Sequence, residues 1–237
     1  MQLLVSVASA AEAVAALDGG ADLIDAKDPR SGALGAVSVD TLRSIRGVVG
    51  TARPVTAALG EGDDPAGIAR AVEAFAAHTA FVKIGFGLVR DDREASSMAA
   101  AAVGAAACAG SGCGVVLVAY ADAPSPFAFE SLSPAWLDMA AGAGAAGVLL
   151  DTAHKDGPAL PDLVEARTLA RWIDWAHARG LFVAAAGKVT AGDFPWIAAC
   201  GADIVGVRGA ACDAGRTGKI SIERVRALAR VLHKEPS

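Results

Sequence analysis

Cysteines, aromatic residues and lysines are all scarce in this chain of 237 residues. The four cysteines contain no CxxC pair and stand in apolar or glycine-rich stretches, so we expect free thiols in a reducing compartment and no disulfide framework. Basic residues are scattered, and the formal net charge is −5. Because no basic run is present to neutralise a phosphate backbone, nucleic acid is excluded as a general partner.

Long hydrophobic runs are also missing. No apolar stretch reaches membrane-spanning length without a charged or turn residue. Met1 leads directly into a strand-like pattern and not into a basic leader segment. We therefore expect a cytoplasmic protein without a membrane partner.

Several familiar catalytic motifs are absent as well, among them the Walker loop, HExxH and GxSxG. Gly142, Gly144 and Gly147 match GxGxxG, but they precede a strand-like run instead of following one, so the dinucleotide-binding interpretation fails. Candidate metal ligands are limited to scattered Asp residues and four isolated His residues, so we expect no metal site.

Apolar residues, in contrast, make up 54% of the chain, and short β-branched runs alternate with Ala-rich amphipathic stretches from end to end. Eight such repeats without a linker predict an α/β fold in which residues 1–237 form a single (β/α)8 barrel domain. A doubly wound open sheet is the structural alternative. The predicted strands are 3–8, 23–28, 54–60, 81–86, 115–122, 147–152, 182–188 and 203–209, and the predicted helices include 10–17, 65–78, 162–179 and 222–232.

The few lysines are placed unusually. The chain has 15 Arg but only six Lys, and four of the six end or closely follow a predicted strand: Lys27, Lys83, Lys155 and Lys188. In a (β/α)8 barrel the carboxyl ends of the strands form the mouth where catalysis takes place. A cluster of amines at that mouth suggests Schiff-base chemistry on a phosphorylated carbonyl compound.

Two of these lysines stand beside carboxylates. Strand alternation puts Asp25 and Lys27 on the inward face of the barrel, where the alternative to a catalytic amine is a structural ion pair. Lys83 is an isolated charge in an apolar strand, which is rare unless the charge is paired or functional. Asp151 ends the sixth strand, four residues before Lys155, and is either a proton shuttle or a helix cap.

Two further side chains near the mouth are weaker candidates. His154 fits a solvated loop histidine better than a general base. Cys212 has no His close in sequence to activate it as a nucleophile.

Phosphate binding is predicted after the last two strands. The runs AAAGK and GVRGAAC provide Gly187, Lys188, Arg208 and Gly209, where glycine lets the backbone approach a phosphate and the cations stabilise it. Residues 30–36 form a second glycine-rich loop beside Lys27, which is either a further ligand loop or a lid.

Four blocks of the chain, LLVSVASAAEAVAALDGGADLIDAKDPRSGALGA, FVKIGF, LLDTAHKDG and DIVGVRGAAC, closely resemble the (5-formylfuran-3-yl)methyl phosphate synthases, also called 4-(hydroxymethyl)-2-furancarboxaldehyde-phosphate synthases. The resemblance covers essentially the whole length. It implies a cofactor-independent lyase that condenses two molecules of glyceraldehyde 3-phosphate for methanofuran-type cofactor biosynthesis, releasing phosphate and water. By the same resemblance Lys27 forms the Schiff base, Lys83 accepts a proton, and Asp151 and Lys155 complete the active site.

Two other functions fit the residues alone. A Schiff-base aldolase acting on another sugar phosphate would need a similar cluster of amines. A catalytically silent phosphosugar-binding subunit would keep the cations without forming a covalent adduct. Whichever function applies, we expect a homo-oligomer, because the Ala-rich exterior helices and Trp172, Trp175 and Trp196 can leave apolar patches.

Overall fold

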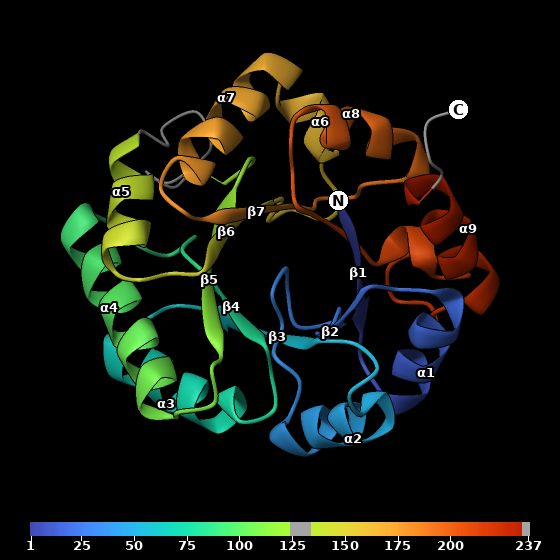
Figure 1. The fold of residues 1–237 in the computed structure, drawn as a ribbon, viewed down its shortest axis with the longest axis horizontal. Coiled ribbons are helices and arrows are strands. Elements are labelled where there is room, and N and C mark those ends of the chain that lie inside the picture. The colour runs from blue at the N-terminus through green and yellow to red at the C-terminus, as the bar shows by residue number, and fades with distance from the viewer. Residues whose placement is uncertain (124–133, 234–237) are drawn as a thin grey trace.

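The computed structural model describes residues 1–123 and 134–233. In this part of the chain, eight parallel strands form a closed barrel in chain order, surrounded by helices (Figure 1). Strand β1 pairs with both β2 and β8, so the barrel is closed. This confirms the predicted (β/α)8 barrel and excludes the open-sheet alternative. The strands are β1 (Gln2–Val7), β2 (Leu23–Ala26), β3 (Val55–Glu61), β4 (Phe81–Gly85), β5 (Gly114–Tyr120), β6 (Gly147–Asp151), β7 (Phe182–Ala185) and β8 (Ile204–Val207).

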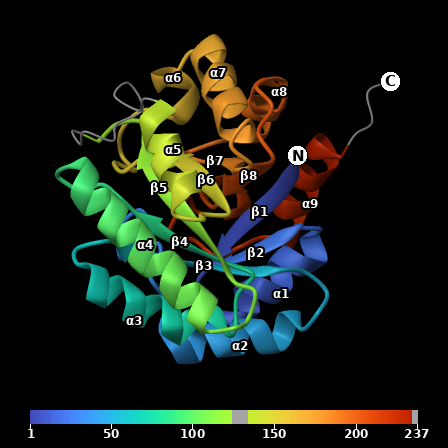
Figure 2. The same ribbon diagram turned by 60° about the vertical axis from the view of Figure 1, so that its left-hand side comes forward.

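The helices between the strands pack side by side around the barrel. Figure 2 shows α3, α4 and α5 lying along one side of it. No helix among the described residues is long and apolar enough to cross a membrane. The helices are α1 (Ala10–Gly19), α2 (Val39–Val49), α3 (Pro65–Ala76), α4 (Asp92–Cys108), α5 (Pro134–Gly142), α6 (Leu160–Leu163), α7 (Ala166–His177), α8 (Phe194–Ala199) and α9 (Ile222–Leu232), with short 3₁₀ turns η2 (Ala191–Asp193) and η3 (Gly209–Ala211).

Local sequence determines where several of these helices begin. Ser9, Ser38, Asp64 and Asp91 precede α1, α2, α3 and α4, and each side chain accepts a hydrogen bond from a backbone N–H in the first turn. These bonds satisfy donors that have no partner inside the helix. Gly20 caps the carboxyl end of helix α1, and its φ of 93° lies in the left-handed region that glycine adopts without strain.

The predicted helix 162–179 is wrong, because the structure has two helices, α6 and α7, in this part of the chain. Val164 interrupts them with extended backbone, at φ −131° and ψ 124°, and its side chain is buried in the core. The backbone N–H of Leu160, the first residue of α6, donates to the carbonyl of Gly187 at 2.9 Å. Burial of the Val164 side chain and the bond between Leu160 and Gly187 favour this break over the continuous helix that the periodicity of the sequence predicts.

Strands β7 and β8 are shorter than predicted. Gly187 has φ 107° and Lys188 has φ 57°, so the chain leaves the β conformation after Ala185. Lys188 is the only residue other than glycine with positive φ among the described residues. After β8, the turn η3 replaces the predicted continuation of the strand to Gly209.

Alternation along the strands produces two apolar layers. Residues on the outer face pack against the helices, while Leu4, Val116, Val118 and Leu149 belong to a separate cluster inside the barrel. At the amino ends of β4 and β7, Phe81 and Phe182 pack edge to face with ring centroids 5.1 Å apart. These rings fill the barrel at the end opposite the mouth, as expected for a packed barrel interior.

Candidate active site

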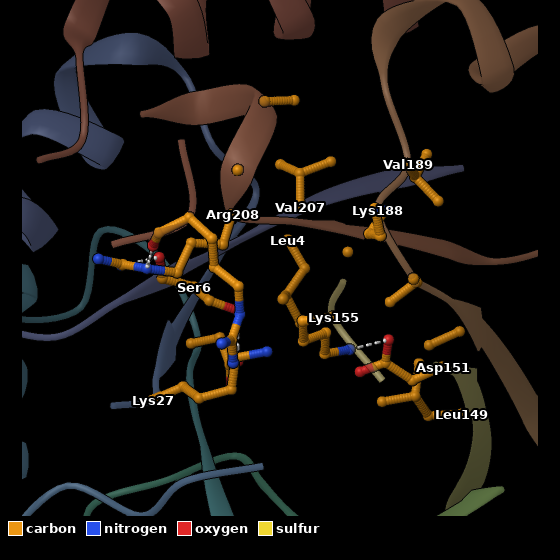
Figure 3. A pocket seen from close by; sticks show the side chains of 18 of the residues that line it. Leu4, Ser6, Lys27, Leu149, Asp151, Lys155, Lys188, Val189, Val207 and Arg208 are labelled. Atoms are coloured by element: carbon orange, nitrogen blue, oxygen red, sulfur yellow. Dashed lines mark hydrogen bonds and ion pairs between the residues drawn. The ribbon is translucent and has the colours of Figure 1, made fainter. Parts of the chain in front are cut away.

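A cavity of about 460 Å³ opens at the carboxyl ends of the strands (Figure 3). The sequence predicted that its candidate site residues would converge at this end of the barrel, and all of them line the cavity. They are Asp25, Lys27, Lys83, Asp151, Lys155, Gly187, Lys188, Arg208 and Gly209.

Asp25 on β2 is the centre of a buried hydrogen-bond network. Its carboxylate accepts bonds from Ser6 Oγ on β1 at 2.9 Å and from Thr56 Oγ1 on β3 at 2.7 Å, and Lys83 Nζ on β4 lies 2.5 Å from Oδ1. Burial alone would raise the pKa of Asp25, but the positive charges of Lys83 and Lys27 lower it below its ordinary value. The carboxylate is therefore ionised at neutral pH and serves as the counter-ion of Lys83.

The second carboxylate, Asp151, ends β6 and pairs with Lys155 in the loop that follows. Lys155 Nζ lies 2.7 Å from Asp151 Oδ1 (Figure 3). The same amine also donates to the Thr152 carbonyl. Burial would raise the pKa of Asp151, but Lys155 and Lys27 lower it, as does the backbone N–H of Thr152. Asp151 is thus a charged acceptor held beside an ammonium group.

Asp122, after β5, holds the loop that carries Lys155. Its two carboxylate oxygens accept hydrogen bonds from the backbone N–H groups of Ala153 at 2.6 Å and His154 at 2.9 Å. Charged acceptors of this kind form strong bonds with backbone amides. The side chain of Asp122 therefore fixes the turn between Asp151 and Lys155 from a neighbouring strand end.

Lys27 follows β2 directly and is buried at the cavity wall. Burial lowers the pKa of its amine to about 8, and the positive charges of Lys155 and Lys83 act in the same direction, while Asp151 and Asp25 oppose the shift. A minority of the amine is therefore neutral near physiological pH, far more than for an exposed lysine. A neutral amine is the form that attacks a carbonyl group.

The loop after β7 forms another wall of the cavity. A Cβ atom at Gly187 would lie 2.9 Å from Thr152 Cγ2, so only glycine fits where this loop crosses the loop after β6. Lys188 is exposed, and its amine donates to the carbonyl of Gly157. Lys188 thus lies over the cavity with its charge unpaired by any described carboxylate.

Arg208, just after β8, is buried and bonded within the protein. Its guanidinium donates to the Glu12 carboxylate at 2.9 and 3.2 Å and to the carbonyls of Ser6, Arg216 and Gly218 at 2.8 to 3.2 Å. These five bonds match the five N–H groups of a guanidinium. The side chain therefore holds the β8 loop in place, and the predicted contact of Arg208 with phosphate stays a prediction.

A further pair of polar groups connects the ends of β3 and β5. Tyr120, the last residue of β5, is buried, and its hydroxyl donates to the Glu61 carboxylate on β3. Glu61 also accepts a bond from the backbone N–H of Gly87 at 2.9 Å. Burial and the charge of Glu61 raise the pKa of Tyr120 far above its ordinary value. The phenol thus stays protonated and ties β5 to the β3 and β4 ends.

Sequence reasoning missed four residues of this region: Ser6, Thr56, Asp122 and Arg216. Ser6 and Thr56 are single polar residues in apolar strands, which is the signal that identified Lys83, and strand register places them beside Asp25. Asp122 and Arg216 lie in loops, where no periodicity marks them.

The two weaker candidates do not enter the polar network. His154 is exposed, as expected for a loop histidine. Cys212 is buried, and burial raises the pKa of its thiol, with the positive charge of Arg208 opposing that shift. No three His, Cys, Asp or Glu side chains of residues 1–123 and 134–233 gather closely enough to hold a metal ion.

Comparisons with known proteins identify relatives over nearly the whole chain. A family model described as 4-HFC-P synthase matches residues 3–229. The (5-formylfuran-3-yl)methyl phosphate synthase of Methanopyrus kandleri is 37% identical over 235 residues, which is 98% of each chain. The synthase of Methanocaldococcus jannaschii is 37% identical over 232 residues, 96% of this chain and 98% of that relative.

Solved structures resemble the chain in fold. Phosphoribosyl anthranilate isomerase from Thermus thermophilus superposes with a TM-score of 0.66 at 17% identity over 98% of both chains. The 3-hexulose-6-phosphate synthase from Salmonella typhimurium gives 0.65 at 18% identity, again over 98% of both chains. At such low identity the likeness extends to the barrel alone.

Proposed function

Because the chain belongs to the 4-HFC-P synthase family, we propose that it condenses two molecules of glyceraldehyde 3-phosphate to 4-(hydroxymethyl)-2-furancarboxaldehyde phosphate through a Schiff base on Lys27. The overall reaction releases one phosphate and two molecules of water, and no electrons enter or leave. Loss of phosphate and water makes the enzyme a carbon–oxygen lyase. Its product is a precursor in methanofuran-type cofactor biosynthesis.

One observation carries the proposal: Lys27 is a buried amine with a pKa lowered to about 8, and it lines the same cavity as two carboxylate–lysine pairs. Schiff-base enzymes need a neutral amine for the attack and separate groups to move protons afterwards. The pairs Asp25–Lys83 and Asp151–Lys155 supply those groups.

The chemistry begins when the neutral Lys27 amine attacks the aldehyde of one triose phosphate and water leaves. The resulting iminium draws electrons and acidifies the adjacent C–H bond, so that the ionised carboxylate of Asp151 can remove the proton. The enamine carbon then attacks the aldehyde of the second molecule. Lys155, next to Asp151, stabilises negative charge that develops on oxygen.

Ring closure, dehydration and loss of phosphate then form the aromatic furan. Hydrolysis of the iminium consumes a water molecule and frees Lys27. During these steps the loops after β7 and β8 hold phosphate through Gly187, Lys188 and Gly209, while Arg208 keeps the β8 loop in position. Asp25 keeps Lys83 aimed into the cavity.

Borohydride trapping with glyceraldehyde 3-phosphate tests the proposal. Borohydride reduces an iminium to a stable amine, and peptide mass mapping then locates the adduct. We expect an adduct on Lys27 in the wild-type protein and none in Lys27→Ala. Lys219→Ala is the matched control, because Lys219 is an exposed lysine outside the cavity.

Product analysis separates the furan synthase from a Schiff-base aldolase. Furan aldehyde phosphate and inorganic phosphate in equal amounts support the synthase. An adduct on Lys27 with an open-chain sugar phosphate as product would point to the aldolase. Substrate binding without an adduct on any lysine would contradict both and leave a phosphosugar-binding protein.

A further inference from the structure

The cations around the cavity differ in how well they are neutralised. Lys83 is paired with Asp25, Lys155 with Asp151 and Arg208 with Glu12, so each of these charges has a counter-ion within 3 Å. Lys188 and Arg216 form no ion pair with any described residue, although both line the cavity. Apart from the reactive amine of Lys27, these two cations are available to an anionic ligand.

Arg216 lies in the loop between η3 and α9, on the opposite flank of the β8 end from Lys188. Its Nη2 donates to the carbonyl of Gly32 at 2.5 Å, which is its only side-chain hydrogen bond within the described residues. The remaining N–H groups of its guanidinium therefore have no acceptor in residues 1–123 and 134–233. The amine of Lys188 likewise donates to a backbone carbonyl, that of Gly157 in the loop after β6. The two cations are thus attached to different loops, after β2 and after β6.

The position of Arg216 is itself held in place. Arg208 Nε donates to the Arg216 carbonyl at 2.8 Å, and the same guanidinium is bonded to Glu12 on α1. The backbone of Arg216 also lies 3.8 Å from the position that a Cβ atom would take at Gly209. Arg208 therefore fixes the backbone of Arg216, whose side chain lines the cavity.

We propose that Arg216 binds the phosphate of the second triose phosphate, in an anion subsite separate from the Gly187, Lys188 and Gly209 subsite of the first. This inference rests on the proposed function. Condensation of two identical phosphorylated molecules places two phosphate groups in one cavity, and their mutual repulsion has to be offset. A guanidinium suits this task because its planar set of N–H groups matches phosphate oxygens and stays charged at all working pH values.

The test separates the first binding event from the second. Borohydride trapping on Lys27 requires a single triose phosphate, whereas formation of the furan requires two. Both are measured against the concentration of glyceraldehyde 3-phosphate for the wild type, Arg216→Gln, Arg216→Lys and Lys219→Gln. Lys219→Gln removes an exposed cation from the same loop but outside the cavity.

For Arg216→Gln, the concentration of glyceraldehyde 3-phosphate that gives half-maximal trapping should stay within about twofold of the wild-type value. The concentration that gives half-maximal furan formation should rise by about tenfold or more, which is the usual effect of losing a charge-assisted hydrogen bond. Arg216→Lys keeps the charge but loses the planar geometry, so the half-saturating concentration for furan formation should rise less than in Arg216→Gln. Lys219→Gln matches the wild type in both assays.

Two results would overturn the inference while leaving the proposed function intact. One is a furan-formation curve for Arg216→Gln that superimposes on the wild type. The other is an equal loss of trapping and of furan formation in both Arg216 variants, which would place Arg216 at the first substrate or in the structure of the loop. Failure of the wild type to form any adduct or furan would instead reject the proposed function, and this inference with it.

Discussion

The ammonium group of Lys83 on β4 lies 2.5 Å from the carboxylate of Asp25 on β2, inside the barrel and across the intervening strand β3. Their side chains are only 7% and 0% exposed. The hydroxyl groups of Ser6 and Thr56 also donate hydrogen bonds to this carboxylate. A pair buried this deeply contributes to stability, because neither charge can be removed without leaving the other buried and unpaired.

Breaking this pair should therefore destabilise the protein strongly. Asp25→Asn and Lys83→Met should each lower the free energy of unfolding by about 3–5 kcal/mol, since each leaves one buried group without its partner. The double variant should lose much less than the sum of the two. Urea denaturation at pH 7 measures all three values.

The matched control is the pair Asp40–Arg43 on α2, which is exposed and has an N–O distance of 3.2 Å. A double-mutant cycle there should give a coupling energy close to zero, as is usual for surface pairs. If the cycle on Asp25 and Lys83 also gave no coupling, the buried pair would have no role in stability.

Lys27 should have the opposite effect on stability. Burial lowers the pKa of its amine from 10.5 to about 8, so at neutral pH the folded protein holds a charged amine that burial disfavours. Lys27→Met should therefore raise the free energy of unfolding at pH 7, by up to about 3 kcal/mol from the size of the pKa shift.

The pH dependence gives the sign of this effect a direct check. Between about pH 8 and 10.5 the unfolded chain binds the proton that the folded protein has released, so the contribution of Lys27 to stability rises with pH in this window. The advantage of Lys27→Met over the wild type should shrink from pH 7 to pH 10 in urea titrations. A wild type more stable than Lys27→Met at pH 7 would contradict the prediction. Lys219→Met, at an exposed position, should change neither value.

Asp122 should matter for activity without touching the substrate, since its carboxylate accepts the backbone N–H groups of Ala153 and His154. Asp122→Ala leaves both amides without this acceptor, and we expect the turnover rate to fall by about tenfold or more as Lys155 loses its fixed position next to Asp151. Asp122→Asn keeps one carbonyl oxygen and should lose less activity.

Amide hydrogen exchange distinguishes positioning of the loop from general damage. Exchange at Ala153 and His154 should speed up in Asp122→Ala, while the amides of β1 and β2 keep their wild-type rates. A variant with unchanged exchange at these two amides and full activity would remove Asp122 from the set of positioning residues.

The barrel and the convergence of the site were predictable for a simple physical reason. Parallel strands in one barrel bring all their carboxyl ends to one mouth, so inward-facing charges such as Lys83 within β4 and Asp151 at the end of β6 are brought together there. The same alternation that identified Lys83 also applies to Ser6 and Thr56. Their polar groups were overlooked because hydroxyl groups are common in strands and only the register with Asp25 gives them a role.

The roles of the two arginines depended on contacts that no local pattern encodes. Glu12 and Arg208 are separated by 196 positions, and their pairing exists only because β1 and β8 close the barrel. Arg216 reaches Gly32 across 184 positions. The break at Val164 has a similar origin, since a buried side chain and a bond to the β7 loop decide it against the helical pattern. Residue type alone therefore pointed to Arg208 but gave no sign of Arg216, whose guanidinium forms no ion pair with any described residue.

Tyr120 offers a spectroscopic test of the region between β3 and β5, because it is the only tyrosine in the chain. Burial and the neighbouring Glu61 carboxylate raise the pKa of its phenol well above the ordinary value, so the folded protein should form no phenolate up to about pH 11. Absorbance near 295 nm should rise only when alkaline unfolding exposes the ring, in step with the loss of circular dichroism. Tyr120→Phe provides the baseline. A phenolate that appears at its ordinary pH in protein still folded by circular dichroism would mean that the hydroxyl is solvated, and that Glu61 holds the β4 loop through Gly87 alone.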